Sequence, residues 1–429
     1  MELTQSNITV SNTYFFNPNL TPTSQAMRSL VEQVAQEVFD YESLRKDRRK
    51  KAEEALGIIL CNLAMMASLA KTEMVIQLNV RAMDLGVRYT PTIITYKRMK
   101  FVIDSLQERE VVSVSKGGTR RIETIDWYDN PVWVQEATRV GLLKLHDQLS
   151  RLGTIEDIRH RASDELVILR DNKQLVSYEE TSLTTRMRQE LVVLNEHIGR
   201  HPVSYLGSNP VDPFAVTLRR HFSDGSFRSG GRLFGHWAQN LPKTERHLLR
   251  IDGERVVDLD FGSMHVSLLH AWDGRVMPEC DPFIIPGFES HRDFVKKASY
   301  CIINSKKPLK RCPEGLRGDL PKGVRWKDLE PAILEHVPLV AQYAYTGAGL
   351  RLMRDESDIL VSVLLGLAEA GIGFIPMHDG LMVPESQVAY AEHLMIDAYA
   401  NHTGQPVRIK RTSYPDPATT PEHELQSAA

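Results

Sequence analysis

The alternation of apolar and polar residues predicts a buried strand at residues 255–261, and a tight turn and a helix follow it. Successive side chains of a strand point to opposite faces, so Asp258 and Asp260 share one face and the apolar residues around them share the other. A carboxylate at the end of a buried strand is costly unless a cation meets it. We therefore expect a cation here, and a divalent metal ion is the first candidate.

A second strand signal lies far downstream, where two short apolar runs at residues 373–383 are separated by the dipeptide Asp379-Gly380. Asp-Gly between apolar runs is the strongest short hairpin signal, and it places Asp379 at the tip of the turn. Asp260 and Asp379 thus come from separate strands, with basic residues between them in the sequence. This combination suggests two-metal phosphoryl transfer, in which Mg²⁺ is held by a few carboxylates and by the phosphates of the substrate.

Residues 291–304 have the spacing of an amphipathic helix. Steps of four place Arg292, Lys296 and Tyr300 on one side of it, and another side is apolar. The polar side offers two cations to a triphosphate and one ring on which a base can stack. An ordinary amphipathic surface helix is the alternative interpretation.

Composition limits the function classes. With 429 residues the chain is long enough for two or three domains, and its formal net charge of -3 excludes a uniformly basic nucleic-acid coat. Binding to nucleic acid would have to come from local patches. The four cysteines have neither paired metal spacing nor the density of a disulfide scaffold, and the start of the chain lacks a basic and apolar leader. We expect a cytoplasmic protein that is not bound to a membrane.

Four segments in the first part of the chain carry predictions of their own. Residues 1–23 are polar and Asn-rich, which indicates an arm, and from Ser24 the apolar spacing predicts a helix. Residues 45–51 are basic, a pattern typical of a solvated helix face, with contact to a phosphate backbone as the alternative. Residues 55–70 are the most apolar segment, too short to span a bilayer, and predict a buried helix.

Residues 24–139 together predict an accessory module. Residues 90–92 have the pattern of a helix start, residues 93–106 that of a helix, and residues 111–127 that of a hairpin with its turn at 116–118. A helix followed by a basic, glycine-tipped hairpin resembles a winged helix, which binds nucleic acid. The alternative is a small α+β domain that packs on the core.

Residues 229–242 read Ser-Gly-Gly-Arg-Leu-Phe-Gly-His-Trp-Ala-Gln-Asn-Leu-Pro. This segment resembles the Thr-Gly-Arg-Leu and Gln-Asn-Ile-Pro elements of the family A (polymerase I-like) DNA polymerases, with a shorter interval between them. Residues 255–265 are similar to motif A of that family, and residues 373–383 to its motif C, the His-Asp hairpin. Residues 291–304 lie between them and resemble the fingers helix of the family, in which Arg, Lys and then Phe or Tyr follow at steps of four. Each motif alone is weak, but all four occur in the order of the family.

The resemblance implies an α+β fold of the right-hand polymerase kind, related also to the single-subunit phage RNA polymerases. An antiparallel palm sheet with helical fingers would occupy residues 214–412, preceded by a helical, thumb-like connector at 140–213. Asn209-Pro210 and the following Asp-Pro mark the boundary between them. Residues 413–429 predict a disordered tail, and no strand in the first half bears the Asp-x-Glu pair of a proofreading exonuclease.

The same resemblance implies roles for individual residues. Asp260 and Asp379, with the carbonyl of Phe261, would hold two Mg²⁺ ions, for which Mn²⁺ can substitute. Asp258 is not required by the family, so we expect a salt bridge there, with metal ligation as the alternative. The other residues implied to contact triphosphate, nascent base pair or primer end are Arg292, Lys296, Tyr300, His378, Arg232, Gln239 and Asn304.

Several positions depart from the family pattern. His265 stands where the DNA polymerases carry a glutamate that excludes the 2′-hydroxyl of ribonucleotides. An imidazole is bulky enough to exclude that hydroxyl, yet it can also hydrogen-bond to it, so the sugar preference stays open. Asn304 replaces a tyrosine that shapes the base-pair pocket, and Cys301 replaces a glycine. Gly380 matches neither the glutamate of the DNA enzymes nor the serine of the RNA enzymes.

The leading hypothesis is a template-directed DNA polymerase, a nucleotidyltransferase that takes a DNA primer-template and nucleoside triphosphates and has no evident proofreading exonuclease. Tyr300 favours this DNA branch. The first alternative is an RNA polymerase or primase on the same palm. The second is a DNA-binding replication protein whose palm is inactive, against which the presence of both Asp260 and Asp379 argues, because a dead site has no use for two buried acids.

Overall fold

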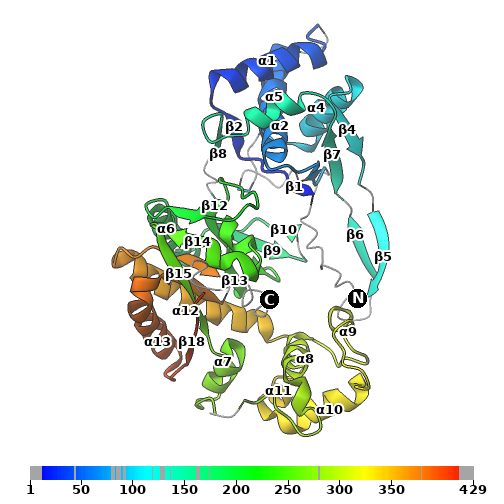
Figure 1. The fold of residues 1–429 in the computed structure, drawn as a ribbon. Helices are drawn as coiled ribbons and strands as arrows, with labels where there is room; N and C mark the ends of the chain where they lie inside the picture. The colour runs from blue at the N-terminus through cyan, green and yellow to red at the C-terminus, as the bar shows by residue number, and fades with distance from the viewer. Residues whose placement is uncertain are drawn as a thin grey trace, which may run out of the picture. The chain divides into compact units, whose positions relative to one another are not determined.

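The computed structural model describes residues 12–42, 45–78, 83, 88–89, 93–117, 119–125, 131–135, 137–160, 165–172, 174–278, 281–377 and 379–414. These residues form two compact units, each discontinuous in sequence. Both units combine helices with mostly antiparallel sheets, which agrees with the predicted α+β class (Figure 1). The first unit comprises 1–120, 133–165 and 209–214, and the second comprises 121–132, 166–208 and 215–429.

The first unit is built on a four-stranded sheet in the order β1-β3-β7-β4, in which only β1 and β3 are parallel neighbours. A short antiparallel pair, β2 with β8, lies beside helices that share one apolar core with the sheet. The elements are β1 Thr13–Phe15, β2 Leu20–Pro22, α1 Gln25–Val38, α2 Lys46–Ser68, β3 Glu73–Ile76, α4 Tyr96–Glu108, β4 Val112–Ser115, β7 Thr138–Leu142, α5 His146–Arg151 and β8 Ile158–His160. The strands β5 Thr119–Ile125 and β6 Pro131–Gln135 pair with each other, and their residues are divided between the two units.

Local signals explain the two longest helices of this unit. Ser24 caps α1, because its side-chain oxygen accepts a hydrogen bond from the backbone N–H of Met27 at 3.1 Å. Along α1 a residue is buried every three or four positions, and along α2 every residue from Ala55 to Ala67 is buried. The helix predicted from Ser24 and the buried helix predicted at 55–70 are therefore confirmed, the second as the apolar part of α2.

The hairpin predicted at residues 111–127 is wrong in its pairing. Strands form on both sides of the predicted turn, but β4 pairs with β7 and β5 pairs with β6. β7 offers β4 an apolar partner, with the fully buried Val140 opposite Val114, and no local turn signal encodes such a distant pairing. The winged-helix prediction thereby loses the hairpin on which it rested. The helix predicted at 93–106 is present as α4, and its predicted start at 90–92 lies outside the described residues.

Two predicted boundaries look different in the structure. Within the predicted arm at residues 1–23, strands β1 and β2 pair with other strands of the first unit. Residues 140–207 contain the helix α6, but strands β7 to β11 also lie there in place of a mostly helical connector. Of the predicted tail at 413–429, only Ser413 and Tyr414 are among the described residues.

The second unit contains a four-stranded sheet, β10-β9-β12-β13, and a six-stranded sheet in the order β11-β14-β15-β17-β16, with β18 paired to β15. All pairs of the six-stranded sheet are antiparallel, as expected. The strands are β9 Val167–Asp171, β10 Gln174–Leu175, β11 Val203–Tyr205, β12 Val216–Ser223, β13 Ser226–His236, β14 Leu249–Ile251, β15 Glu254–Phe261, β16 Ile375–Met377, β17 Gly380–Pro384 and β18 Ile409–Thr412.

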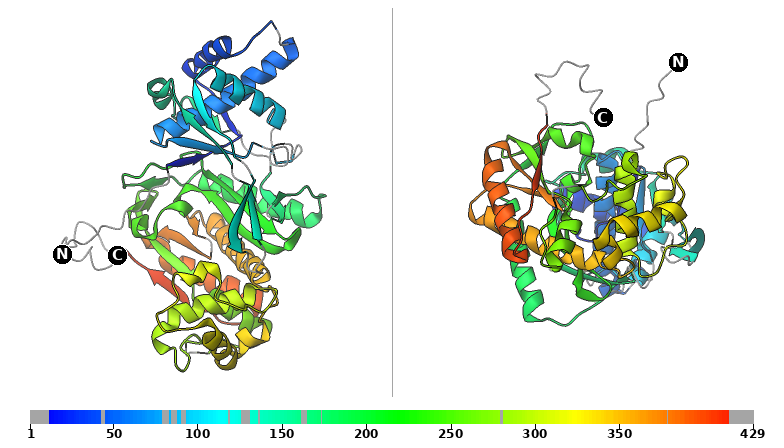
Figure 2. Two further views of the ribbon diagram at one scale, coloured as in Figure 1. Left: turned by 90° about the vertical axis from the view of Figure 1, so that its right-hand side faces the viewer. Right: turned by 90° about the horizontal axis from the view of Figure 1, so that it is seen from below.

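The long helix α12 joins the parts of this unit, because it packs against β13 and contacts α6, α7, α8 and α13. Figures 1 and 2 show α8, α10 and α11 grouped together. Of the helices described here, none has both the length and the apolar character needed to cross a bilayer. The helices are α6 Ser182–Ile198, α7 Met264–Trp272, α8 Arg292–Asn304, α9 Glu314–Arg317, α10 Trp326–His336, α11 Pro338–Gln342, α12 Gly349–Glu369 and α13 Val388–Thr403.

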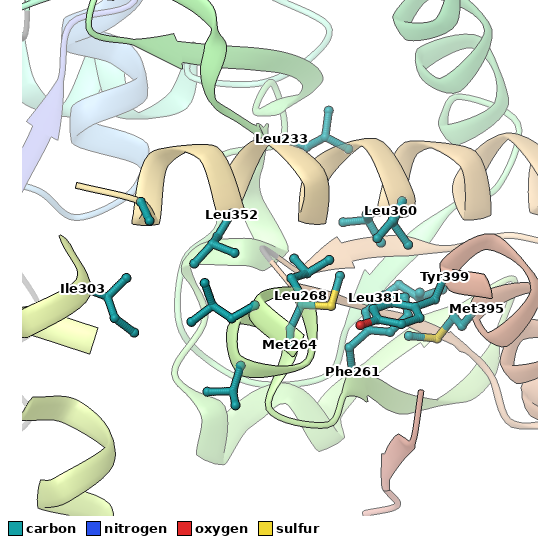
Figure 3. Packing of buried hydrophobic residues seen from close by; sticks show 14 of the residues in the cluster. Leu233, Phe261, Met264, Leu268, Ile303, Leu352, Leu360, Leu381, Met395 and Tyr399 are labelled. Carbon is teal, nitrogen blue, oxygen red and sulfur yellow. The ribbon is translucent and has the colours of Figure 1, made fainter. Parts of the chain in front are cut away.

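The apolar core of the second unit fixes the central strand β15. Figure 3 shows Phe261 of β15 beside Tyr399 of α13, and their ring centroids are 6.1 Å apart. Leu381 of β17 and Met264 of α7 belong to the same buried cluster. Because the apolar face of β15 is anchored in this way, its opposite face must present the two aspartates of the strand.

Candidate active site

The central strand β15 carries the first predicted acid. It pairs antiparallel with β17 on one edge and with β18 on the other. In these registers Asp260 lies opposite Gly380 of β17 and opposite Lys410 of β18. Alternation places the side chain of Asp258 on the same face as that of Asp260, as the sequence predicted.

The second predicted acid lies in the hairpin of β16 and β17. Met377 pairs with Gly380, so Gly380 belongs to β17, and Asp379 alone of the predicted Asp-Gly turn precedes the strand. His378 lies outside the described residues. Asp379 is exposed, so the prediction that both acids are buried is wrong for this residue, and it directly precedes the residue opposite Asp260. The fold therefore brings both acids to the same end of two neighbouring strands.

Gly380 permits this approach. A Cβ on Gly380 would lie 2.4 Å from Oδ1 of Asp260 and 2.4 Å from the carbonyl oxygen of Leu259. No side chain fits at such distances unless the carboxylate and the strand backbone move. The departure from the family pattern at position 380 thus has a steric explanation, because only glycine fits beside Asp260.

The charges of the acids act on one another. Burial is the main cause that raises the pKa of Asp260 to about 6, and the carboxylates of Asp258 and Asp379 raise it further. Lys243 and Arg246 oppose this shift without cancelling it. A carboxyl group in this environment is stabilised in its charged form by any cation that reaches it.

Asp258 has the basic partner that the sequence analysis expected. The side chain is only 1% exposed, and its Oδ2 accepts hydrogen bonds from Nη1 of Arg246 at 3.1 Å and from the hydroxyl of Tyr414 at 3.4 Å. Burial raises the pKa of Asp258, and the charge of Arg246 offsets only part of that rise. Its other oxygen, Oδ1, has no hydrogen-bond partner among the described residues.

The donor set fits a divalent metal ion that also binds substrate. Within the described residues no three His, Cys, Asp or Glu side chains form a complete ligand group. Asp260 and Asp379 would therefore need further oxygen ligands from phosphates, which is how Mg²⁺ is commonly bound at phosphoryl-transfer sites. Burial, followed by the charges of Asp258 and Asp379, raises the pKa of Asp260, and Oδ1 of Asp258 has no hydrogen-bond partner among the described residues, so a cation at this place would stabilise both carboxylates. Phe261, the third predicted ligand, ends β15 and pairs with Ile409.

Helix α8 carries the two predicted phosphate-binding cations. Arg292 begins the helix, and its guanidinium donates hydrogen bonds to Oδ2 of Asp281 at 2.8 Å and to Oδ1 of Asp293 at 2.7 Å. Lys296 is half-buried, and burial followed by the charge of Arg292 lowers its pKa, while Asp281 and Asp379 act in the other direction. Arg292 is thus neutralised by two carboxylates, whereas Lys296 lies within electrostatic reach of Asp379.

Tyr300, the third residue on the polar side of α8, lies among other rings. Nζ of Lys296 is 5.9 Å from its ring centroid. The rings of His265 and Phe283 meet it edge to face, at centroid distances of 5.6 Å and 6.0 Å. Burial raises the pKa of Tyr300, and the charge of Asp379 is the next largest cause. The polar side of α8 and the tip of the β16-β17 hairpin therefore face the same region.

A buried carboxylate that the sequence analysis did not single out links two of the predicted residues. Glu356 of α12 is 1% exposed, and Arg232 of β13 donates to it twice, from Nε to Oε1 at 2.6 Å and from Nη2 to Oε2 at 3.0 Å. Nε2 of His265 lies 3.0 Å from Oε2 of the same carboxylate. Burial alone would raise the pKa of Glu356, but the contacts with His265 and Arg232 outweigh burial and lower it.

A sequence signal for Glu356 did exist. Leu352, Glu356 and Leu360 follow at steps of four along the buried side of α12. A carboxylate within an apolar stripe of a helix is typical of a buried ion pair, because an unpaired charge is rarely tolerated there. The same helix holds Asp358, whose Oδ1 accepts a hydrogen bond from the buried Arg220 of β12 at 2.5 Å. These ion pairs fix α12 against the β12-β13 hairpin.

The side-chain amide of Gln239 makes all of its hydrogen bonds with backbone groups. Its Oε1 accepts from the N–H groups of Gly235 at 3.0 Å and His236 at 3.2 Å, and its Nε2 donates to the carbonyls of Leu233 at 3.1 Å and Pro376 at 3.0 Å. A side-chain amide offers two donors and two acceptor positions, so all four are used. In this structure Gln239 joins β13 to β16.

Asn304 is the last residue of α8, and its side chain is exposed. A Cβ on Gly349 would lie 1.5 Å from its Oδ1, so the amide rests against the first residue of α12. The structure thus groups only some of the predicted residues. Those connected by pairing, contact or charge are Asp260, Asp379, Arg292, Lys296, Tyr300, His265 and Arg232.

No protein-family model matches the chain, and no curated protein matches it. Among solved structures, it is similar to the POL domain of Pol1 from M. smegmatis in complex with a DNA primer-template and dNTP. This similarity has a TM-score of 0.32 and 13% sequence identity, and it covers 53% of this chain and 51% of that chain, about half of each.

Proposed function

We propose that the protein is a template-directed DNA polymerase, a nucleotidyltransferase that extends a DNA primer with deoxynucleotides. One observation carries the proposal: Asp260 and Asp379 lie at the same end of two paired strands, within electrostatic reach of a helix that bears Lys296 and Tyr300. Two carboxylates for metal ions, a cation for phosphates and a ring for a base are what nucleotidyl transfer requires.

Asp260 and Asp379 would hold two Mg²⁺ ions, with substrate phosphates and the carbonyl of Phe261 as further ligands. Bound Mg²⁺ would lower the pKa of the primer 3′-hydroxyl and neutralise charge on the triphosphate. The chain itself fixes the carboxylates, because the core anchors β15 and Gly380 leaves room for the hairpin beside Asp260. Since the pKa of Asp260 is raised to about 6, activity should rise as the pH passes that value.

The cations of α8 would receive the triphosphate. Lys296 is half-buried beside Tyr300, which suits a contact with one phosphate group under a stacked base. Arg292 would have to exchange Asp281 and Asp293 for phosphate oxygens, which are multiply charged acceptors for the same guanidinium. In this proposal the six-stranded sheet is the palm and helices α8 to α11 are the fingers.

The contacts of His265 support a preference for deoxynucleotides. Its imidazole lies edge to face with Tyr300, and its Nε2 lies 3.0 Å from the buried Glu356. A ring confined on both sides cannot turn away from an incoming sugar, so it would exclude a 2′-hydroxyl by its bulk. Arg232, bound twice by the same carboxylate, would lie beside the primer end.

An RNA polymerase or primase is the second candidate, because an imidazole also has a second nitrogen that can hydrogen-bond a 2′-hydroxyl. The proposal is tested by primer extension with the full chain and Mg²⁺, comparing deoxynucleotides with ribonucleotides, with and without a primer. We expect extension of a primer by deoxynucleotides, abolished in Asp260→Asn and in Asp379→Asn. The exposed Asp397, which pairs with His393 on α13, supplies the matched control Asp397→Asn, which should extend normally. Ribonucleotide incorporation alone, or synthesis without a primer, would favour the second candidate, and no incorporation under any condition would overturn both.

A further inference from the structure

The most basic segment of the chain projects from the first unit. Six of the seven residues at 45–51 are basic, the exception being Asp47, in a chain whose formal net charge is -3. Arg45 is the N-cap of α2, and the others form its first two turns, all of them exposed or half-buried. From Ala55 to Ala67 the same helix is buried. Burial of its second half holds α2 in place and presents the basic turns to solvent.

These cations lie at the N-terminus of α2, where positive charges stabilise a helix least. The N-terminus of a helix carries partial positive charge, which acids stabilise and bases do not. Only Asp47 is acidic in the first turn of α2, and the side chain of Arg45 makes no capping hydrogen bond. Lys46 and Lys50 are also one turn apart, a spacing at which like charges repel. Helix stability therefore does not explain the run, whereas a polyanionic ligand would.

Aromatic rings adjoin the basic run. The guanidinium carbon of Arg49 is 5.5 Å from the ring centroid of Tyr41, and Tyr41 meets Phe39 edge to face at 6.3 Å. Phe39 in turn stacks on Phe101 of α4, with centroids 5.5 Å apart and planes at 18°. Phe101 is 38% exposed, and the exposed Lys97 precedes it by one helical turn. The exposed ring of Phe101, which stacks on Phe39, is therefore connected to the basic run through the ring contacts of Phe39 and Tyr41.

We propose that this basic-aromatic surface, formed by residues 45–51, Tyr41, Lys97 and Phe101, binds single-stranded nucleic acid. The cations contact successive phosphates, and Phe101, backed by Phe39, accepts an unpaired base. A duplex keeps its bases stacked on each other and offers none to the ring. A membrane surface would be met by a broad apolar helix face, and this surface has one exposed ring. The proposal does not depend on the polymerase activity.

The test uses the intact chain and a fluorescently labelled oligothymidylate, whose binding is followed by anisotropy at several salt concentrations. The variant Arg48→Gln/Lys51→Gln should bind more weakly, and its plot of log affinity against log salt should be shallower by about 1.4, from about 0.7 per lost phosphate contact. The matched control Arg28→Gln/Arg151→Gln removes two exposed arginines from the same unit and should bind as the unaltered chain does.

A second variant tests the ring. Phe101→Leu keeps apolar contact with Phe39 but removes the π face, so affinity should fall roughly tenfold with an unchanged salt dependence. Binding is measured in the Asp260→Asn background as well, where it should be the same, which separates this surface from catalysis. Unaltered affinity in Arg48→Gln/Lys51→Gln, or an equal loss in the control, would overturn the proposal. Binding to phosphatidylserine vesicles is measured for the same proteins. If Arg48→Gln/Lys51→Gln loses binding to these vesicles but still binds oligothymidylate as the unaltered chain does, the surface binds a membrane and the proposal is wrong.

Discussion

Gly380 and Asp260 lie directly opposite each other in the antiparallel pair of β15 and β17, where a Cβ on Gly380 would lie 2.4 Å from Oδ1 of the aspartate. The carboxylate of Asp260 therefore occupies the space that a side chain at position 380 would need. This contact decides how closely Asp379, the next residue of the hairpin, approaches the strand that holds Asp260. The metal-binding hypothesis depends on that approach.

The substitution Gly380→Ala tests the contact. The added methyl group must displace the carboxylate of Asp260 or the backbone at Leu259, and overpacking of this kind costs about 1–3 kcal/mol. We expect a lower free energy of unfolding in urea and a large loss of primer extension. Gly315→Ala is the control, because a Cβ there meets no atom within 4 Å. A Gly380→Ala protein that is as stable and as active as the unaltered one would show that the approach does not matter.

The raised pKa of Asp260 predicts a pH dependence of stability. Its pKa of about 6 in the folded protein exceeds the value of about 3.9 in an unfolded chain, so the folded state binds this proton more tightly. Stability should fall as the pH rises between about 4 and 6, and above that range the ionised group costs on the order of 2 kcal/mol. Asp260→Asn should therefore be more stable than the unaltered protein at about pH 8 and equally stable at about pH 4. Urea unfolding at both pH values measures this, and equal stability at both would refute it.

The same acid predicts how Mg²⁺ affects melting. Because bound metal requires ionised carboxylates, Mg²⁺ should raise the melting temperature at about pH 8 and have little effect at about pH 5. Asp260→Asn should lose the increase at the higher pH. An increase of the same size in Asp260→Asn would mean that the ion binds elsewhere.

Because Glu356 contacts both Arg232 and His265, we expect one substitution there to change both the free energy of unfolding and the discrimination between deoxynucleotides and ribonucleotides. Glu356→Gln keeps the shape but removes the charge that holds Arg232 and His265, so stability should fall by about 1–3 kcal/mol. A less confined His265 should also discriminate less between deoxynucleotides and ribonucleotides, as His265→Ala should. The ratio of kcat/KM for the two sugars measures this, with the exposed Glu335→Gln as control. If neither substitution changes the ratio, His265 is not the residue that senses the sugar.

Two adjacent lysines of α8 allow the effect of a direct contact with the substrate to be distinguished from the effect of losing one positive charge. Lys296 is half-buried near Asp379, whereas Lys297 is exposed and pairs with Asp319 at 2.6 Å. Lys296→Met should lower kcat/KM for nucleotides by at least about tenfold while the protein stays folded, because a desolvated cation is lost from the phosphates. Lys297→Met removes the same charge and should have little effect. Similar losses in both variants would point to a non-specific electrostatic effect.

Local patterns predicted the elements on which the site is built. The polar oxygen of Ser24 caps α1, the alternation around Asp260 produces β15, and the two apolar runs around Asp379 pair as a hairpin. Each of these depends on residues a few positions apart, which is the range over which hydrophobic period and capping act. The salt bridge of Asp258 was predictable for a similar reason, because a buried carboxylate needs a cation.

What the sequence did not reveal depends on residues far apart in the chain. β4 takes its partner from residues 138–142, although a glycine-tipped turn suggested the next strand. Gly380 lies in strand β17 and not in the predicted Asp-Gly turn, because a residue without a Cβ is needed there to fit against Asp260. Glu356 forms its ion pair with Arg232 only because α12 packs on β13. Such contacts are set by tertiary packing, which local patterns do not contain.

Single-nucleotide incorporation opposite a defined template base tests the central claim most directly. A labelled primer-template is mixed with the full chain, Mg²⁺ and one deoxynucleotide at a time, and the same reaction is run with Asp260→Asn and Asp379→Asn. We predict addition of the complementary deoxynucleotide by the unaltered chain and loss of this addition in both variants. Incorporation that persists in either variant, or that ignores the template base, would contradict it.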